Sequence, residues 1–531
     1  MVDRRLEPHD SNQLELKLAY GIEPGRRTQR YRVETYIFVP TTLGLNSKSY
    51  PAERFYEDTA GFIRLKTPTV ALSSLADETQ ARSWFEPIAE LLNGHLSGEM
   101  KDYTGSIRRL KLLGCIYRRA LRDEMLDVLE RFDRLEPTGS IAASAGDAEL
   151  AEELITFHDQ VKAATNRLTS LGRRCESAAM NLEVREIWRR VDEYVSIVSE
   201  DVATKLVEAT DERLRDVEAA SPLRESREQL ANIAVSSYQH RRAQGYPSFV
   251  NEDAENEVLT HRRRVLKRTV ASSLYLDLLQ ERPGRYLQDL IGMVAAAAAM
   301  LFAVYVTIEA QEAWPDFGGP FIAVAVVSYM IKDRIKEWAK RYLAKPLRRF
   351  LPDHVIKVVD SDGREVGVCR EAFALVDPSQ LDADIIRLRH IDHPTASAEA
   401  GRPETVLHYA KDVVLSSKGL SAQLPGIEAL SDIIRFNLGR LRRRMDNPYE
   451  EYRLVHPERR ELMSVPCARV YHVNIVLKVT SGRGKSASVE TERARVIVDQ
   501  RGIKRIETVA VTGSGAPSRR YDPTVDMSEL E

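Results

Sequence analysis

The chain has 531 residues, of which 43% are hydrophobic and 29% are charged, with a formal net charge of −2. This length exceeds what one hydrophobic core usually organises, so we expect about two to four folded units, and the balanced charge argues against a nucleic-acid partner. Four widely spaced cysteines without a CxxC pair argue against a disulfide framework or a structural zinc site and favour a reducing compartment.

The N-terminal segment, residues 1–66, reads as a small β-containing module. It has no apolar run typical of a signal peptide, so we do not expect export by that route. Leu14–Tyr20 alternates apolar and polar residues, and Tyr31–Val39 is rich in β-branched and aromatic residues, as strands are. We expect these two strands to pair as a hairpin.

Residues 67–285 are interpreted as a bundle or stalk of long helices. Apolar residues between Leu150 and Leu182 recur at alternating steps of four and three. Such a seam is typical of helices that pack along their length, either as an intramolecular bundle, which we favour, or as an intermolecular coiled coil. A second apolar register begins at Val184, so we expect a break, a kink or a change of partner there.

The next segment, residues 286–331, contains two apolar runs. Leu290–Ile308 has 19 uncharged residues and Phe317–Ile331 has 15. As helices they would be about 28 and 22 Å long, compared with about 30 Å for the hydrocarbon core of a bilayer. Pro315, Gly318, Gly319 and Pro320 between them predict a tight reversal. We therefore expect a two-helix transmembrane hairpin, with a buried hairpin in a soluble protein as the alternative.

Basic residues flank this hairpin on both sides, whereas the turn is acidic. By the positive-inside rule, both termini are expected in the cytoplasm, most simply at a bacterial inner membrane. Charge that sets the topology is the ordinary explanation for the basic helix of residues 332–352, and lipid sensing is the alternative. The residues expected at the membrane surface or in contact with lipid are Lys332, Arg334, Lys336, Lys340, Arg341, Lys345, Arg348 and Arg349.

A run of five alanines lies in the first apolar segment. Small residues let helices approach closely in lipid, where no hydrophobic effect drives them together. We therefore expect a packing surface, within the hairpin or between copies of an oligomer, at Ala295, Ala296, Ala297, Ala298 and Ala299.

The C-terminal part is interpreted as an α+β domain over residues 353–512 and a disordered tail over 513–531. "HVIKVVDSDGREVGVC" predicts two strands joined at an Asp-Gly turn, and three consecutive strands are expected between residues 468 and 511. Between these groups, residues 425–445 predict an amphipathic helix with a basic end. That end is a candidate anion site, or an ordinary solvated helix terminus, at Arg440, Arg442, Arg443 and Arg444.

No catalytic motif is convincing. "SGRGKSAS" resembles the end of a phosphate-binding loop, but Val479 replaces the first glycine and a strand is expected to follow, so we interpret it as a hairpin turn. His390, Asp392 and His393 are weak metal-ligand candidates, because no second cluster accompanies them. We expect no catalytic residue, no metal and no cofactor.

Together these patterns predict an α+β membrane protein, with a mainly helical N-terminal cytoplasmic region that includes a small sheet and a β-rich C-terminal cytoplasmic domain. We interpret it as a two-pass membrane-anchored scaffold or sensor that contacts the lipid bilayer, forms homo-oligomers and could bind a cytoplasmic protein. The alternative is an oligomeric ion channel or membrane-permeabilising effector. An enzyme is the third choice.

Overall fold

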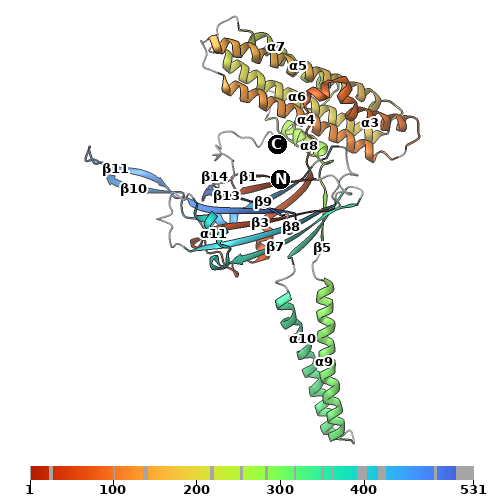
Figure 1. Ribbon diagram of the computed structural model, residues 1–531, viewed down its shortest axis with the longest axis vertical. Helices are drawn as coiled ribbons and strands as arrows, with labels where there is room; N and C mark the ends of the chain where they lie inside the picture. Colours follow the sequence, from red (N-terminus) through yellow and green to blue (C-terminus); the bar gives the residue numbers. More distant parts are fainter. Residues whose placement is uncertain are drawn as a thin grey trace. The chain divides into compact units, whose positions relative to one another are not determined.

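A computed structural model describes residues 2–509 except 23–27, 101, 136–140, 216–220, 251–254, 282–284, 316–317, 348–351, 361–362, 392–402, 417–425, 428 and 483–486. The chain divides into two compact units (Figure 1). We call the first the β unit, which consists of Met1–Ile63, Leu276–Gln423 and Ala429–Glu531. The second is the helical unit, Arg64–Tyr275 with Leu424–Glu428.

The larger sheet of the β unit has eight strands in the order β14-β13-β12-β3-β8-β7-β6-β5. Neighbouring strands are antiparallel throughout. The predicted pair β6–β7 and the predicted meander β12–β13–β14 are confirmed. The strands are β3 (Thr28–Pro40), β5 (Asp277–Glu281), β6 (His354–Val359), β7 (Glu365–Val376), β8 (Glu404–Ser416), β12 (Tyr471–Ser481), β13 (Ser488–Asp499) and β14 (Gly502–Val509).

The smaller sheet has four strands in the order β1-β2-β9-β4. These are β1 (Val2–Pro8), β2 (Gln13–Gly21), β9 (Ala429–Asn437) and β4 (Thr59–Leu65). The expected pairing of β2 with β3 is wrong, because β2 pairs with β1 and β9 whereas β3 pairs with β8 and β12. The loop between β2 and β3 therefore connects the two sheets.

The helix expected over residues 425–445 is also wrong. Ala429–Asn437 is strand β9, and only the four-residue helix α14 (Gly439–Arg442) follows it. The spacing of Leu430, Ile434 and Leu438 fits a helix, but Ile433, Ile434 and Phe436 also suit a strand. The strand forms because β2 offers a complete antiparallel partner, from Gln13 opposite Asn437 to Gly21 opposite Ala429.

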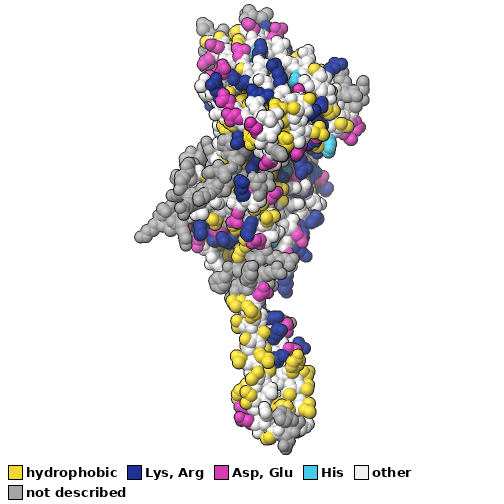
Figure 2. All heavy atoms as spheres, turned by 90° about the vertical axis from the view of Figure 1, so that its right-hand side faces the viewer, with side chains coloured by type: hydrophobic (Ala, Val, Ile, Leu, Met, Phe, Trp, Pro, Cys, Tyr) yellow, Lys and Arg dark blue, Asp and Glu magenta, His cyan; other side chains and the backbone are white. Residues whose placement is uncertain are grey.

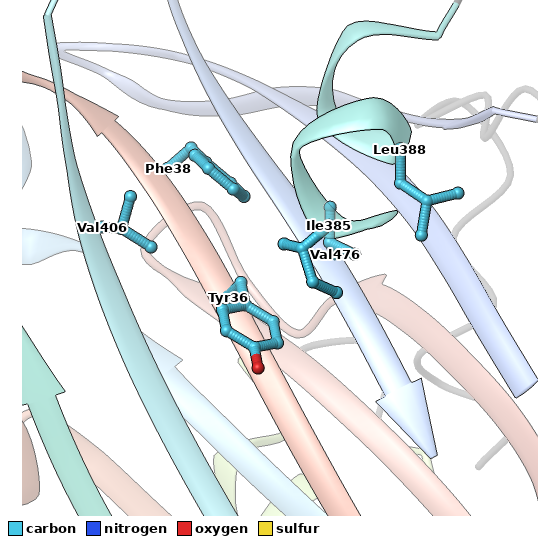
Figure 3. Close-up of a cluster of buried hydrophobic side chains, with 6 residues drawn as sticks. All are labelled: Tyr36, Phe38, Ile385, Leu388, Val406 and Val476. Carbon is cyan, nitrogen blue, oxygen red and sulfur yellow. The ribbon is translucent and has the colours of Figure 1, made fainter. Parts of the chain in front are cut away.

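The two sheets enclose an aromatic core. Phe55 of α1 (Ala52–Glu57) stacks on Phe373 of β7 with ring centroids 4.1 Å apart, and Tyr409 of β8 contacts Phe436 of β9 at 6.2 Å. On the opposite face of the larger sheet, α11 (Ala383–His390) packs Ile385 and Leu388 against Tyr36 and three other side chains of that sheet (Figure 3). Short 3-10 helices cover Thr41–Leu43 and Pro378–Gln380.

The helical unit is a bundle built from helices of one chain. The apolar seam of α5 is buried from Leu150 to Cys175, and α5 packs mainly on α2 and α7. The chain leaves the helix between Cys175 and Leu182, so the expected break is present, but it begins before the predicted position at Val184, and Leu182 of the predicted seam is exposed. The helices are α2 (Leu72–Ala76), α3 (Glu78–Leu96), α4 (Thr104–Arg134), α5 (Ile141–Cys175), α6 (Leu182–Leu214), α7 (Leu223–Ala243) and α8 (Glu257–Ala271).

A polar cluster joins α6 to the end of α7. Asp192 Oδ2 lies 2.7 Å from His240 Nε2 and accepts a hydrogen bond of 2.7 Å from the Tyr246 hydroxyl. The hydrogen bond with Asp192 raises the pKa of His240 above its ordinary value of 6.5. Glu176 adds to this shift, whereas burial and Arg241 oppose it.

Replacing Asp192 with Asn is expected to lower the pKa of His240 and to destabilise the helical unit mainly at acidic pH. A group whose pKa is higher in the folded than in the unfolded state stabilises the fold fully at pH values below its unfolded-state pKa. This stabilisation is lost as the pH rises through the folded-state pKa. The difference in unfolding free energy between wild type and Asp192→Asn should therefore shrink from pH 5 to pH 9. Urea denaturation followed by tryptophan fluorescence measures it; a difference that does not change with pH would contradict the assignment.

Two further pairs of elements complete the β unit. Helices α9 (Arg285–Ala313) and α10 (Gly319–Leu347) form an antiparallel hairpin that is inserted between the paired strands β5 and β6. Strands β10 (Tyr449–Val455) and β11 (Leu462–Ala468) form a separate two-stranded ribbon whose side chains are almost all exposed.

The predicted two-helix transmembrane hairpin is wrong, although the overall fold is a mixed α+β one. Within the described residues only one helix, over Asp289–Ala313, is long and apolar enough to cross a membrane. In α10 the uncharged part ends at Ile331, and Lys332, Asp333, Arg334 and Lys336 follow. From Gly319 that part is only about 20 Å long, which is too short for a hydrocarbon core of about 30 Å.

Candidate membrane-contact surface

The contact between α9 and α10 is made by small residues. Ala295 is 0% and Ala299 1% exposed, and Ala310 and Ser328 are buried as well. Ala297 and Ala298 are exposed and Ala296 is half-buried. The predicted alanine run is therefore divided, because two of its members face α10 and the others lie on the outer sides of α9.

The outer sides of the hairpin carry large apolar side chains (Figure 2). Leu301, for example, is 72% exposed. Such residues occur along most of α9 and along the first half of α10, and two aromatic residues lie in the second half of α10. They are Leu290, Met293, Val294, Met300, Leu301, Val304, Tyr305 and Ile308 of α9, and Ile322, Val326, Val327, Tyr329, Met330, Ile331, Trp338 and Tyr342 of α10.

The second half of α10 is charged and lies beside the first half of α9. A β-carbon built on Gly292 would lie 3.8 Å from Cε of Lys340, which fixes this pairing of the two helices. The Lys332 ammonium lies 3.8 Å from the centroid of the Tyr329 ring, in a cation–π contact. The hairpin is thus apolar on both helices near its turn, but farther from the turn it is apolar on α9, whereas α10 carries charged residues together with the exposed Trp338 and Tyr342.

The predicted basic residues differ in their exposure, and only some of their side chains belong to the described part of the chain. Lys332, Lys336 and Lys340 are half-buried along α10, and Arg334 is exposed. The side chains of Arg341 and Lys345, and the whole of Arg348 and Arg349, lie outside the described part of the chain. The four described cations share one helix with Asp333 and Glu337, so this surface carries both signs of charge.

The predicted anion candidates fall into two groups. Arg444 donates to the backbone carbonyls of Leu43 and Gly44, at 2.9 and 2.8 Å, and serves to hold that loop. Arg440, Arg442 and Arg443 instead line one cavity of about 400 Å³.

The remaining candidate residues, the three metal-ligand candidates and the segment "SGRGKSAS", are not brought together in the described part of the chain. His390 ends α11 and is exposed, whereas Asp392 and His393 lie outside the described residues. Among the residues that are described, no group of three or more His, Cys, Asp or Glu side chains is arranged to hold a metal. Residues 483–486 of "SGRGKSAS" also lie outside that part, and the flanking strands β12 and β13 pair up to Ser481 opposite Ser488.

Sequence reasoning missed a buried ionic cluster between the two sheets. Lys411 of β8 is 1% exposed; its ammonium lies 2.8 Å from Asp432 of β9 and 3.3 Å from Glu371 of β7. Burial lowers the pKa of Lys411, but the two carboxylates together raise it well above its ordinary value. The Tyr20 hydroxyl also donates to Asp432, at 3.2 Å. A lysine in the inward-facing alternation of "LHYAKDVVLS" is the one signal that could have shown it.

Comparison of the chain with models of protein families, with curated proteins and with solved structures finds no match in any of the three. The functional interpretation therefore depends on the geometry and chemistry of this chain alone.

Proposed function

We propose that the protein is a scaffold attached to a membrane by the α9–α10 hairpin, with α9 as the helix that enters the apolar layer. The observation that carries the proposal is the exposure of α9. Core helices of soluble proteins can be equally long and apolar, but they are buried, whereas nearly all of α9 outside its contact with α10 is exposed. An exposed apolar surface of this extent marks a site of contact with a membrane or with another protein surface.

Lipid is a suitable cover for this surface because the charged side chains of the hairpin lie apart from most of its exposed apolar side chains. The lipid-facing side would consist of α9 and the uncharged half of α10, while Lys332, Arg334, Lys336 and Lys340 would remain at the anionic headgroups. Basic residues before α9 and in α10 favour the cytoplasmic leaflet. The two compact units would then act as the parts that bind cytoplasmic partners, in line with the lack of a recognisable catalytic motif in the sequence.

Flotation with vesicles of phosphatidylethanolamine and phosphatidylglycerol tests the proposal. The full chain should float and should resist a carbonate wash. A variant in which residues 285–347 are replaced by a short Gly-Ser turn should stay in solution, and it should retain its fold because β5 and β6 already pair. A full chain that fails to float would refute membrane attachment. Oligomers that are lost with the hairpin would then identify copies of the chain as its cover.

A further inference from the structure

The cavity at Arg440, Arg442 and Arg443 is built by five separate segments of the β unit. The β1–β2 turn contributes Asn12, the connection between α1 and β4 contributes Asp58, the end of β9 contributes Asn437, the β13–β14 turn contributes Gln500, and α14 with the residue after it contributes the arginines. Its volume of about 400 Å³ lies within the range of small-molecule sites, roughly 300–1,000 Å³.

Backbone hydrogen bonds connect these segments to one another. The Leu438 amide donates to the Asn12 carbonyl at 2.8 Å, and the Asn437 amide donates to the Asp58 carbonyl at 2.8 Å. A β-carbon on Gly502 would collide with the Ser11 carbonyl oxygen, so glycine is needed where the β13–β14 turn meets the β1–β2 turn. The walls are therefore held in place without a ligand.

The three arginines differ in how their charge is balanced. Arg440 Nε lies 2.9 Å from Asp58 and its Nη2 lies 2.5 Å from Glu57, so two carboxylates neutralise it. Arg442 donates from Nε and Nη2 to the Gln500 carbonyl, at 3.0 and 2.7 Å, and this neutral group orients the guanidinium without cancelling its charge. The side chain of Arg443 is exposed and, among the described residues, forms no hydrogen bond or ion pair.

Two uncompensated guanidinium groups in a preformed cavity with amide side chains match the needs of a phosphate group. Guanidinium groups bind phosphate through paired, charge-assisted hydrogen bonds, and the amides of Asn12, Asn437 and Gln500 can bind further oxygen atoms. We propose that this cavity binds a phosphate-bearing small molecule or headgroup through Arg442 and Arg443. The inference is independent of the hairpin.

The test measures binding to the full chain in two arms. In the first, pyrophosphate is titrated into the detergent-solubilised protein by calorimetry. In the second, vesicles with and without phosphatidylinositol 4-phosphate are compared by flotation. Arg443→Gln is the principal variant, because Arg443 has no internal contact to lose, and Arg442→Gln is the second. Arg453→Gln, which removes an exposed arginine from β10, is the matched control.

Binding in either arm should weaken about tenfold or more in Arg443→Gln and remain unchanged in Arg453→Gln. Pyrophosphate binding identifies a soluble phosphate ligand, and a response to the phosphoinositide alone identifies a lipid headgroup. Absence of binding in both arms, or equal weakening in the control, overturns the proposal. Because the pyrophosphate arm needs no membrane, its outcome is separate from that of the membrane-attachment test.

Discussion

Replacing Asp432 with Ala is expected to destabilise the β unit by about 3 kcal/mol or more. Asp432 is 0% exposed and provides the nearest carboxylate to the buried Lys411 ammonium. Its removal would leave Lys411 with Glu371 alone at 3.3 Å, and would also remove the acceptor of the Tyr20 hydroxyl. A buried charge that loses its partner keeps the cost of its desolvation, which is why the effect is large.

Hydrogen exchange measured by mass spectrometry at β8 and β9 is the suitable readout, because none of the four tryptophans lies in either strand. Asp412→Ala is the matched control, since Asp412 is the next residue to Lys411 and its carboxylate is exposed; we expect a change below about 1 kcal/mol there. Joint replacement by Lys411→Met, Asp432→Leu and Glu371→Gln, which removes all three buried charges, should recover most of the lost stability. Equal effects of Asp432→Ala and Asp412→Ala would contradict the role assigned to the cluster.

This cluster also illustrates the limits of prediction from sequence. Local alternation was sufficient to predict β6, β7 and the meander β12–β14, because each pairs with a neighbour along the chain. The pairing of β2 with β9 joins residues more than 400 positions apart, and no local pattern indicates it. Lys411 and Asp432 are only 21 positions apart, but they lie in different sheets, so their contact depends on how the two sheets pack and could not be predicted from either segment alone.

The hairpin shows a different limit. Counting uncharged residues correctly identified two helices and a reversal, but it treated each helix separately. The pairing of Gly292 with Lys340 shows that the charged half of α10 lies beside the apolar half of α9. The helix beside α9 is therefore not a second membrane span. In the membrane contact that we propose, α9 and the uncharged half of α10 face lipid, and the charged half of α10 does not.

Replacing Leu301 and Val304 together with Lys is expected to abolish binding to vesicles. Both side chains lie on the outer side of α9 and are 72% and 43% exposed, so the change should leave the contact with α10 intact. A lysine costs about 2.5–3.5 kcal/mol at the centre of a membrane helix. Even half of that cost for each residue, about 3 kcal/mol in total, would weaken binding by more than a hundredfold.

The matched control places the same two charges on the helical unit, as Val235→Lys with Val258→Lys, at positions that are 52% and 73% exposed. This variant has the same net charge as the first and should bind anionic vesicles at least as well as wild type, because basic residues are attracted to such surfaces. Flotation and circular dichroism of both variants separate the two explanations. If the α9 variant floats as wild type does, then lipid does not cover Leu301 and Val304; if both variants fail equally while folded, added charge rather than lost apolar contact is responsible.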